Sequence, residues 1–123
     1  MSDRVYGTIK QNDTPPLRVY IEDESGTPLK QSDVVSIHRK IYDLDSDTPT
    51  TAIDESDLEV SETIYDELQP WTADSTGYNF MDVVKGGHFT LPNRRYEVVY
   101  RITTSAGLVI HPDPFELKTI RTF

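Results

Sequence analysis

The chain has no cysteine among its 123 residues. Disulfide bridges, zinc ribbons, zinc fingers and cysteine nucleophiles are therefore excluded, and nothing in the fold depends on an oxidising compartment. Long apolar runs are also missing, since no stretch approaches the roughly 20 apolar residues that span a bilayer. The first residues, MSDRVYGTIK, lack the apolar core of a signal peptide. We expect a protein that is made and used in aqueous surroundings, with no membrane partner.

Positive charge is scarce, with 12 lysines and arginines against 21 aspartates and glutamates and a net charge of −9. Affinity for a phosphate backbone comes from clustered lysines and arginines that release counterions. Nucleic acid is therefore not an expected partner.

Signatures of catalysis and of transition-metal binding are missing as well. There is no G-x-S-x-G elbow for a serine nucleophile. The three histidines, His38, His88 and His111, lie on different segments without a helical i, i+4 pair, which favours surface histidines over zinc ligands. We expect no enzymatic activity, no cofactor and no metal site.

The segment 43–57, DLDSDTPTTAIDESD, carries six acidic residues and no basic one. Its D-x-D-x-D spacing resembles the start of a calcium loop, but position six of an EF-hand loop requires glycine and is Thr48 here. No flanking helices are indicated. We interpret the segment as a long, solvated acidic loop, and whether it binds an ion or a partner stays open.

The longest two-residue alternation runs through LPNRRYEVVYRITT, residues 91–104, and predicts a half-buried strand. Its core face would hold Tyr96, Val98, Tyr100 and Ile102. The strand follows a sharp corner at Leu91 and Pro92, and a tyrosine just after such a corner is typical of immunoglobulin-like sandwiches. We expect Tyr96 to be buried there, with its hydroxyl bonded to backbone across the corner.

Shorter alternating segments are separated by turn-forming residues and predict the other strands. These lie at 5–10, 17–22, 33–42, 78–84, 108–110 and 115–120. Arg39 is out of character at an inward position and indicates a bulge or the end of the core. The segment 58–68 fits a strand followed by a turn, which we favour, or a helical turn. The chain 1–123 is thus predicted to be one all-β domain, an immunoglobulin-like β-sandwich of about seven antiparallel strands with a long acidic loop.

Edge strands present rows of unpaired backbone groups to neighbouring chains. We predict such edges at the first strand and at the terminal segment 115–123. The candidate interface residues are Val5, Ile9, Trp71, Phe115, Leu117 and Phe123. Trp71 is interpreted as a core or interface anchor, and the alternative is a sugar platform that it forms with Tyr65 and Tyr78.

The order of motifs along the chain resembles a known family. The matching pieces are IKQNDTPPL at 9–17, the D-x-x-G-x-P turn at 23–28, the strand 34–42, Trp71-Thr72, the strand 96–102 and the S-x-G hairpin at 105–107. This layout is similar to the small immunoglobulin-like modules of tailed-phage virions, including the amino-terminal domain of baseplate upper proteins.

The resemblance implies a non-enzymatic virion structural protein of the tail, baseplate or neck, which is made in the host cytoplasm and resides in the virion. It implies partners among other virion proteins, in multiple symmetric copies, contacted through strand edges, loops and termini. Two alternatives stay open: a head decoration protein of the capsid, and a carbohydrate-binding or adhesion module.

Overall fold

The computed structural model describes residues 4–72 and 76–121 of the chain. Within these residues the elements follow one another as β1 (Val5–Lys10), β2 (Pro16–Val19), the 3-10 turn η1 (Gln31–Asp33), β3 (Val34–Asp43), β4 (Ala52–Leu58), α1 (Val60–Thr63), β5 (Ile64–Gln69), β6 (Tyr78–Val83), β7 (Arg95–Thr104), β8 (Val109–Ile110) and β9 (Phe115–Ile120). No helix in the described part of the chain is long and apolar enough to cross a membrane.

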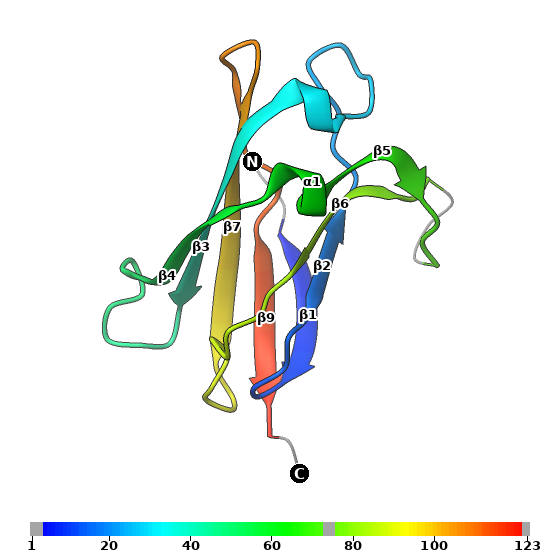
Figure 1. Cartoon of the computed structure of the whole chain (residues 1–123). Coiled ribbons are helices and arrows are strands. Elements are labelled where there is room, and N and C mark those ends of the chain that lie inside the picture. The colour runs from blue at the N-terminus through cyan, green and yellow to red at the C-terminus, as the bar shows by residue number, and fades with distance from the viewer. Residues whose placement is uncertain (1–3, 73–75, 122–123) are drawn as a thin grey trace.

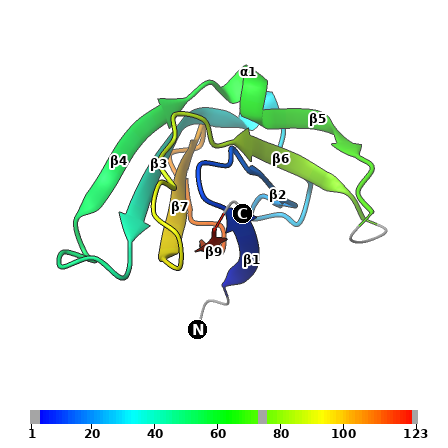
Figure 2. The same cartoon turned by 90° about the horizontal axis from the view of Figure 1, so that it is seen from below.

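The strands form two facing sheets, which enclose the core (Figures 1 and 2). The larger sheet has the order β1-β9-β7-β3-β4, with the short β8 paired to β7, and the smaller sheet has the order β2-β6-β5. The expected all-β sandwich is confirmed. The strand that follows the tyrosine corner, β7, lies between β3 and β9, as strand F lies between C and G in immunoglobulin domains.

The pairing differs from the expectation in one place. β1 runs parallel to β9, with Val5 opposite Phe115 and Ile9 opposite Thr119, whereas the other paired strands are antiparallel. A wholly antiparallel sandwich was therefore the wrong prediction. The parallel arrangement is possible because β1 and β9 are not consecutive and need no tight turn between them.

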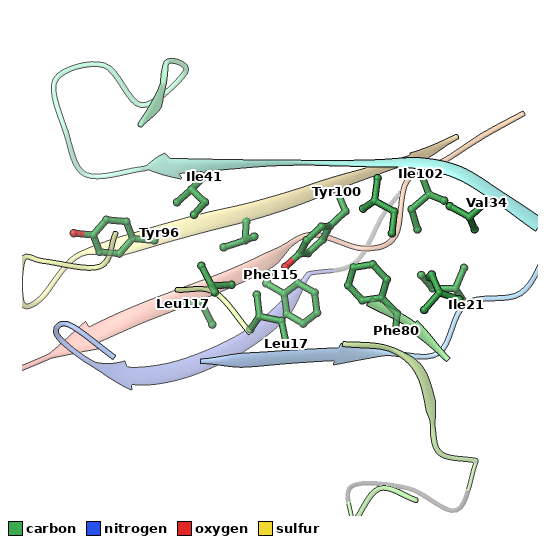
Figure 3. Close-up of a cluster of buried hydrophobic side chains, with 14 of the residues drawn as sticks. Leu17, Ile21, Val34, Ile41, Phe80, Tyr96, Tyr100, Ile102, Phe115 and Leu117 are labelled. Carbon is green, nitrogen blue, oxygen red and sulfur yellow. The ribbon is translucent and has the colours of Figure 1, made fainter. Parts of the chain in front are cut away.

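The core follows the predicted face of β7. Tyr96, Val98, Tyr100 and Ile102 are each at most 2% exposed. The side chains of Tyr100 and Ile102 lie between the two sheets (Figure 3), and the rings of Tyr100 and Phe80 meet edge to face with centroids 4.9 Å apart. Such pairs stabilise a core beyond the apolar area that they bury.

The corner before β7 is closed by Tyr96. The Leu91 N–H donates a hydrogen bond to the Tyr96 hydroxyl at 3.2 Å, and the Tyr96 ring packs edge to face on Phe89. Asn93 adopts a φ of 58°, a left-handed conformation that asparagine tolerates better than most residues. Leu91 is 44% exposed and Pro92 is half-buried, so the tyrosine is the buried member of the predicted corner.

Three other predictions about the strands are wrong. The terminal strand β9 is no edge, because it lies between β1 and β7. Most of the second half of the expected acidic loop forms β4, which pairs with β3 and leaves only residues 44–51 as the connection. The segment 58–68 contains the helical turn α1 before β5 rather than a strand followed by a turn.

Arg39 marks neither a bulge nor the end of the core. It lies in regular pairing between Ser56 of β4 and Tyr100 of β7 and is 6% exposed. A charged group at such a position requires a buried counter-charge, and Asp82 of the facing sheet supplies it.

Candidate functional site

The most distinctive surface feature is an apolar cleft where the edges of the two sheets face each other. Its walls come from β1 and β2, its floor from β9, and one end from the segment after β5. We call it the β1/β2 groove; it is lined by Val5, Tyr6, Gly7, Ile9, Pro15, Pro16, Leu17, Arg18, Trp71, Phe115 and Leu117 and has a volume of about 290 Å³. Figures 1 and 2 show β1 and β2 lying together on this side of the sandwich.

The alternation of β1 explains one wall of the groove. Val5, Gly7 and Ile9 share the side of the strand that faces the sandwich interior, while Tyr6 projects outward and is 71% exposed. Gly7 allows a close approach to the floor, since a Cβ at this position would lie 3.2 Å from Cδ2 of Leu117. A larger residue at position 7 would therefore require the Leu117 side chain to shift.

The predicted interface residues converge on this groove, but in different roles. Val5, at 41% exposure, and the half-buried Ile9 and Trp71 are accessible to a partner. Phe115 and Leu117 are each only 3% exposed and form the floor, so the prediction that they lie on a free edge is corrected. Phe123 lies outside the described residues.

Aromatic side chains gather at the Trp71 end of the groove. The Tyr65 and Tyr78 rings lie 5.8 Å apart at 86°, and the Trp71 and Tyr78 rings lie 6.0 Å apart at 85°. The three residues of the alternative sugar platform are thus brought together. Their perpendicular packing does not give one shared flat face on which a sugar ring could stack.

Among the described residues that line the groove, Arg18 alone is charged. Its guanidinium carbon lies 5.4 Å from the centroid of the Tyr78 ring, a cation–π contact. Within residues 4–72 and 76–121, no carboxylate lies within ion-pair distance of Arg18, although the chain as a whole is strongly acidic. The groove therefore combines apolar walls with one available positive charge.

A cluster of three polar side chains is buried between the sheets and does not line the groove. We call it the Arg39 cluster; it consists of Arg39, Asp82 and Tyr100. One Asp82 oxygen accepts hydrogen bonds from Arg39 Nη1 at 3.0 Å and from the Tyr100 hydroxyl at 2.7 Å. Burial and the neighbouring Asp82 carboxylate hold the pKa of Tyr100 well above its usual value, so the phenol stays protonated as a donor. This arrangement joins the two sheets.

Carboxylates of the acidic segment lie within ion-pair distance of Arg94, Arg95, His38 and His88, and no ion pair is found for His111 among the described residues. Arg94 bonds to Asp43 at 3.0 Å and Arg95 to Asp45 at 2.9 Å, so these carboxylates are already neutralised. His38 lies between Asp57 and Glu55, and its hydrogen bonds to them raise its pKa. No group of three or more potential metal ligands occurs among the described residues.

Comparisons with protein-family models, with curated proteins and with solved structures found no match for this chain. The arguments about function below therefore depend on its own residues.

Proposed function

We propose that the protein is a non-enzymatic structural component of a tailed-phage particle, of the tail, baseplate or neck, that joins other virion proteins. The observation that carries the proposal is the β1/β2 groove, in which an edge strand, an exposed valine and the lone tryptophan surround an apolar floor. The resemblance of the motif order to phage immunoglobulin-like modules indicates the kind of particle.

Apolar surface at the groove supports a protein contact. Val5 and Tyr6 of β1 are both exposed, and a soluble protein rarely leaves a cleft lined by such side chains uncovered without a use for it. Trp71 has the size and amphipathic character of residues that dominate binding energy at interfaces. Its position at the mouth of the groove fits the role of an interface anchor.

The edges of the larger sheet differ in a way that favours β1 as the contact. β4, at the other edge, carries Asp54, Glu55 and Asp57, and inward or outward charges of this kind protect an edge against pairing. β1 has the sequence VYGTIK, with no carboxylate and no proline. A neighbouring chain would therefore meet less resistance at β1.

Incorporation into particles tests the proposal. Val5→Asp places a charge in the groove, and we expect it to lower the amount of protein in purified phage particles by about tenfold or more. Val109→Asp is the matched control, because Val109 is similarly exposed in the same sheet, at 50%, but does not line the groove. Circular dichroism checks that both variants are folded.

Two results would count against the proposal. Equal incorporation of both variants would show that the groove does not make the contact. Absence of the unaltered chain from particles would show that the protein has no virion role. Electron cryomicroscopy of the particles separates a tail, baseplate or neck position from head decoration. A glycan-array signal that is lost in Trp71→Ala would favour the adhesion module instead.

A further inference from the structure

Beyond a general role in assembly, the geometry points to the chemistry of the partner, an inference that rests on the proposed function. We propose that the β1/β2 groove binds an extended segment of a partner protein, which adds to β1 as a strand, inserts alternate apolar side chains and pairs one carboxylate with Arg18. Four features of the structure carry this.

The first feature is the direction of the backbone groups of β1. The N–H groups of Val5 and Gln11 donate to Pro114 O and Ile120 O, both at 2.9 Å. The backbone N–H and carbonyl groups of odd-numbered residues in β1 therefore face β9. Even-numbered groups face away from it. The result is an outward row of donors and acceptors at the open side of the sheet.

Part of that row is already capped within the chain. The Lys10 N–H donates to the Asp13 carboxylate at 3.0 Å, and the Lys10 carbonyl accepts the Asp13 N–H at 3.1 Å. Tyr6 and Thr8 lie outside this turn, and in the described part of the chain no strand pairs with their side of β1. Their two N–H and two carbonyl groups are a template for a short added strand.

The second feature is that the facing edge of β2 cannot compete for the same strand. Pro15 O accepts the Val84 N–H at 3.0 Å, so the backbone N–H and carbonyl groups of odd-numbered residues in β2 face β6. The backbone groups of Pro16 and Arg18 therefore face outward. Pro16 has no N–H to donate. An incoming strand therefore pairs with β1 and packs its side chains against β2.

The third feature is the form of the groove. A strand added to β1 turns every second side chain toward the sandwich interior, which at this edge is the apolar lining with Leu17, Trp71 and the β9 floor. The volume of about 290 Å³ lies at the lower limit of the roughly 300–1,000 Å³ that is usual for small-molecule pockets. Anchor side chains of a peptide fit this space better than a cofactor does.

The fourth feature is charge complementarity. Arg18 stacks on Tyr78 and has no carboxylate partner among the described residues, so its guanidinium donors are available to a bound peptide. A carboxylate there would form a charge-assisted, bidentate pair. One carboxylate suits the site better than an acidic tract, because the net charge of −9 repels a strongly acidic segment.

The experiment uses a synthetic eight-residue peptide that alternates valine and threonine and contains one glutamate, with a second peptide that carries glutamine instead. Binding is followed by NMR of the full chain at up to millimolar peptide. We expect amide shifts and slower hydrogen exchange at Tyr6 and Thr8, and a dissociation constant about tenfold lower for the glutamate peptide, a difference of about 1.4 kcal/mol. In Arg18→Gln the two peptides should bind equally.

Thr8→Pro tests the added strand directly. Proline at this position removes only an outward donor and leaves the bonds between β1 and β9 in place, so we expect a folded protein that binds the glutamate peptide at least about tenfold more weakly. Thr8→Val keeps the N–H and is the matched control, with affinity unchanged. If Thr8→Pro does not fold, hydrogen exchange at Tyr6 and Thr8 of the unaltered chain decides whether the peptide adds to β1 as a strand.

Lack of binding, exchange rates at Tyr6 and Thr8 that do not change, or equal affinity for both peptides in the unaltered chain would each overturn the inference. Particle incorporation separates it from the proposed function. If Thr8→Pro enters particles as well as the unaltered chain does, the virion role stands and the added strand is wrong. If the unaltered chain does not enter particles, the virion role is wrong whatever the peptides do.

Discussion

Removal of the Asp82 charge should destabilise the fold strongly, because it leaves the Arg39 guanidinium unbalanced between the sheets. Arg39 and Asp82 are 6% and 7% exposed, and breaking a buried ion pair from one side costs about 3–5 kcal/mol. Asp54 lies 3.4 Å from Arg39 Nη2 and stays in place as a weaker counter-charge. We therefore expect Asp82→Asn to lower the free energy of unfolding by about 3 kcal/mol, the lower end of that range.

Urea denaturation followed by circular dichroism measures this loss. With a slope of about 1–3 kcal/mol per molar urea, a loss of about 3 kcal/mol lowers the midpoint by about 1–3 M. Asp47→Asn is the matched control, since this aspartate lies exposed in the connection between β3 and β4 and such surface changes stay within about 0.5 kcal/mol.

The combined change Arg39→Met, Asp82→Leu and Tyr100→Phe separates charge from packing. It removes both buried charges, the Tyr100 hydroxyl that donates to Asp82, and the Arg39 Nε, which has no hydrogen-bond partner among the described residues. We expect it to recover most of the stability lost in Asp82→Asn, because apolar replacements of buried pairs are often neutral or stabilising. A loss below about 1 kcal/mol in Asp82→Asn, or a triple variant as unstable as the single one, would refute this reasoning.

Two further predictions concern the corner and the outer face of the larger sheet. Tyr96→Phe should lower the free energy of unfolding by about 0.5–1.5 kcal/mol, because it removes the acceptor of the Leu91 N–H but keeps the buried ring. An unchanged urea midpoint would contradict the stabilising role of this hydrogen bond at the corner. Hydrogen bonds to Asp57 and Glu55 raise the pKa of His38 in the folded state. These hydrogen bonds stabilise the fold fully below the unfolded pKa of about 6.5, and this stabilisation is lost as the pH rises through the higher folded pKa. The difference in unfolding free energy between the unaltered chain and His38→Gln should therefore shrink from pH 6 to pH 9, and a constant or growing difference would contradict it.

Local signals in the sequence were sufficient for the central strand and its corner. The alternation through Tyr96, Val98, Tyr100 and Ile102 marks the core face of β7, and the proline at position 92 marks where the chain turns. Both are properties of consecutive residues. They can therefore be recognised without knowledge of the neighbouring strands.

Strand order could not be predicted in the same way, because it depends on contacts between distant segments. The terminal strand has the composition of an edge, yet β1 pairs with it from the other end of the chain and makes it internal. The acidic residues 54, 55 and 57 looked unsuitable for a strand. In the fold, Arg39 and Lys40 of β3 supply counter-charges for Asp54 and Glu55, and His38 forms hydrogen bonds with Glu55 and Asp57.

The Arg39 cluster left a signal that was misinterpreted. Arg39 was predicted at an inward position of its strand, whereas no prediction was made for Asp82, the residue that pairs with it in the core. Arg18 left no such signal, because the alternation of Leu17 and Val19 predicts only that it faces away from the core. Its contact with Tyr78 and its place in the groove depend on how β2 and β6 pair.

The most direct test of the account is an electron cryomicroscopy map of the phage particle that resolves strands in and around this protein. The account predicts a backbone segment of a neighbouring protein hydrogen-bonded along Tyr6 and Thr8 of β1, with a carboxylate at Arg18 and apolar side chains over Phe115 and Leu117. A particle in which the β1/β2 groove is empty and the contacts are made through other surfaces would contradict it.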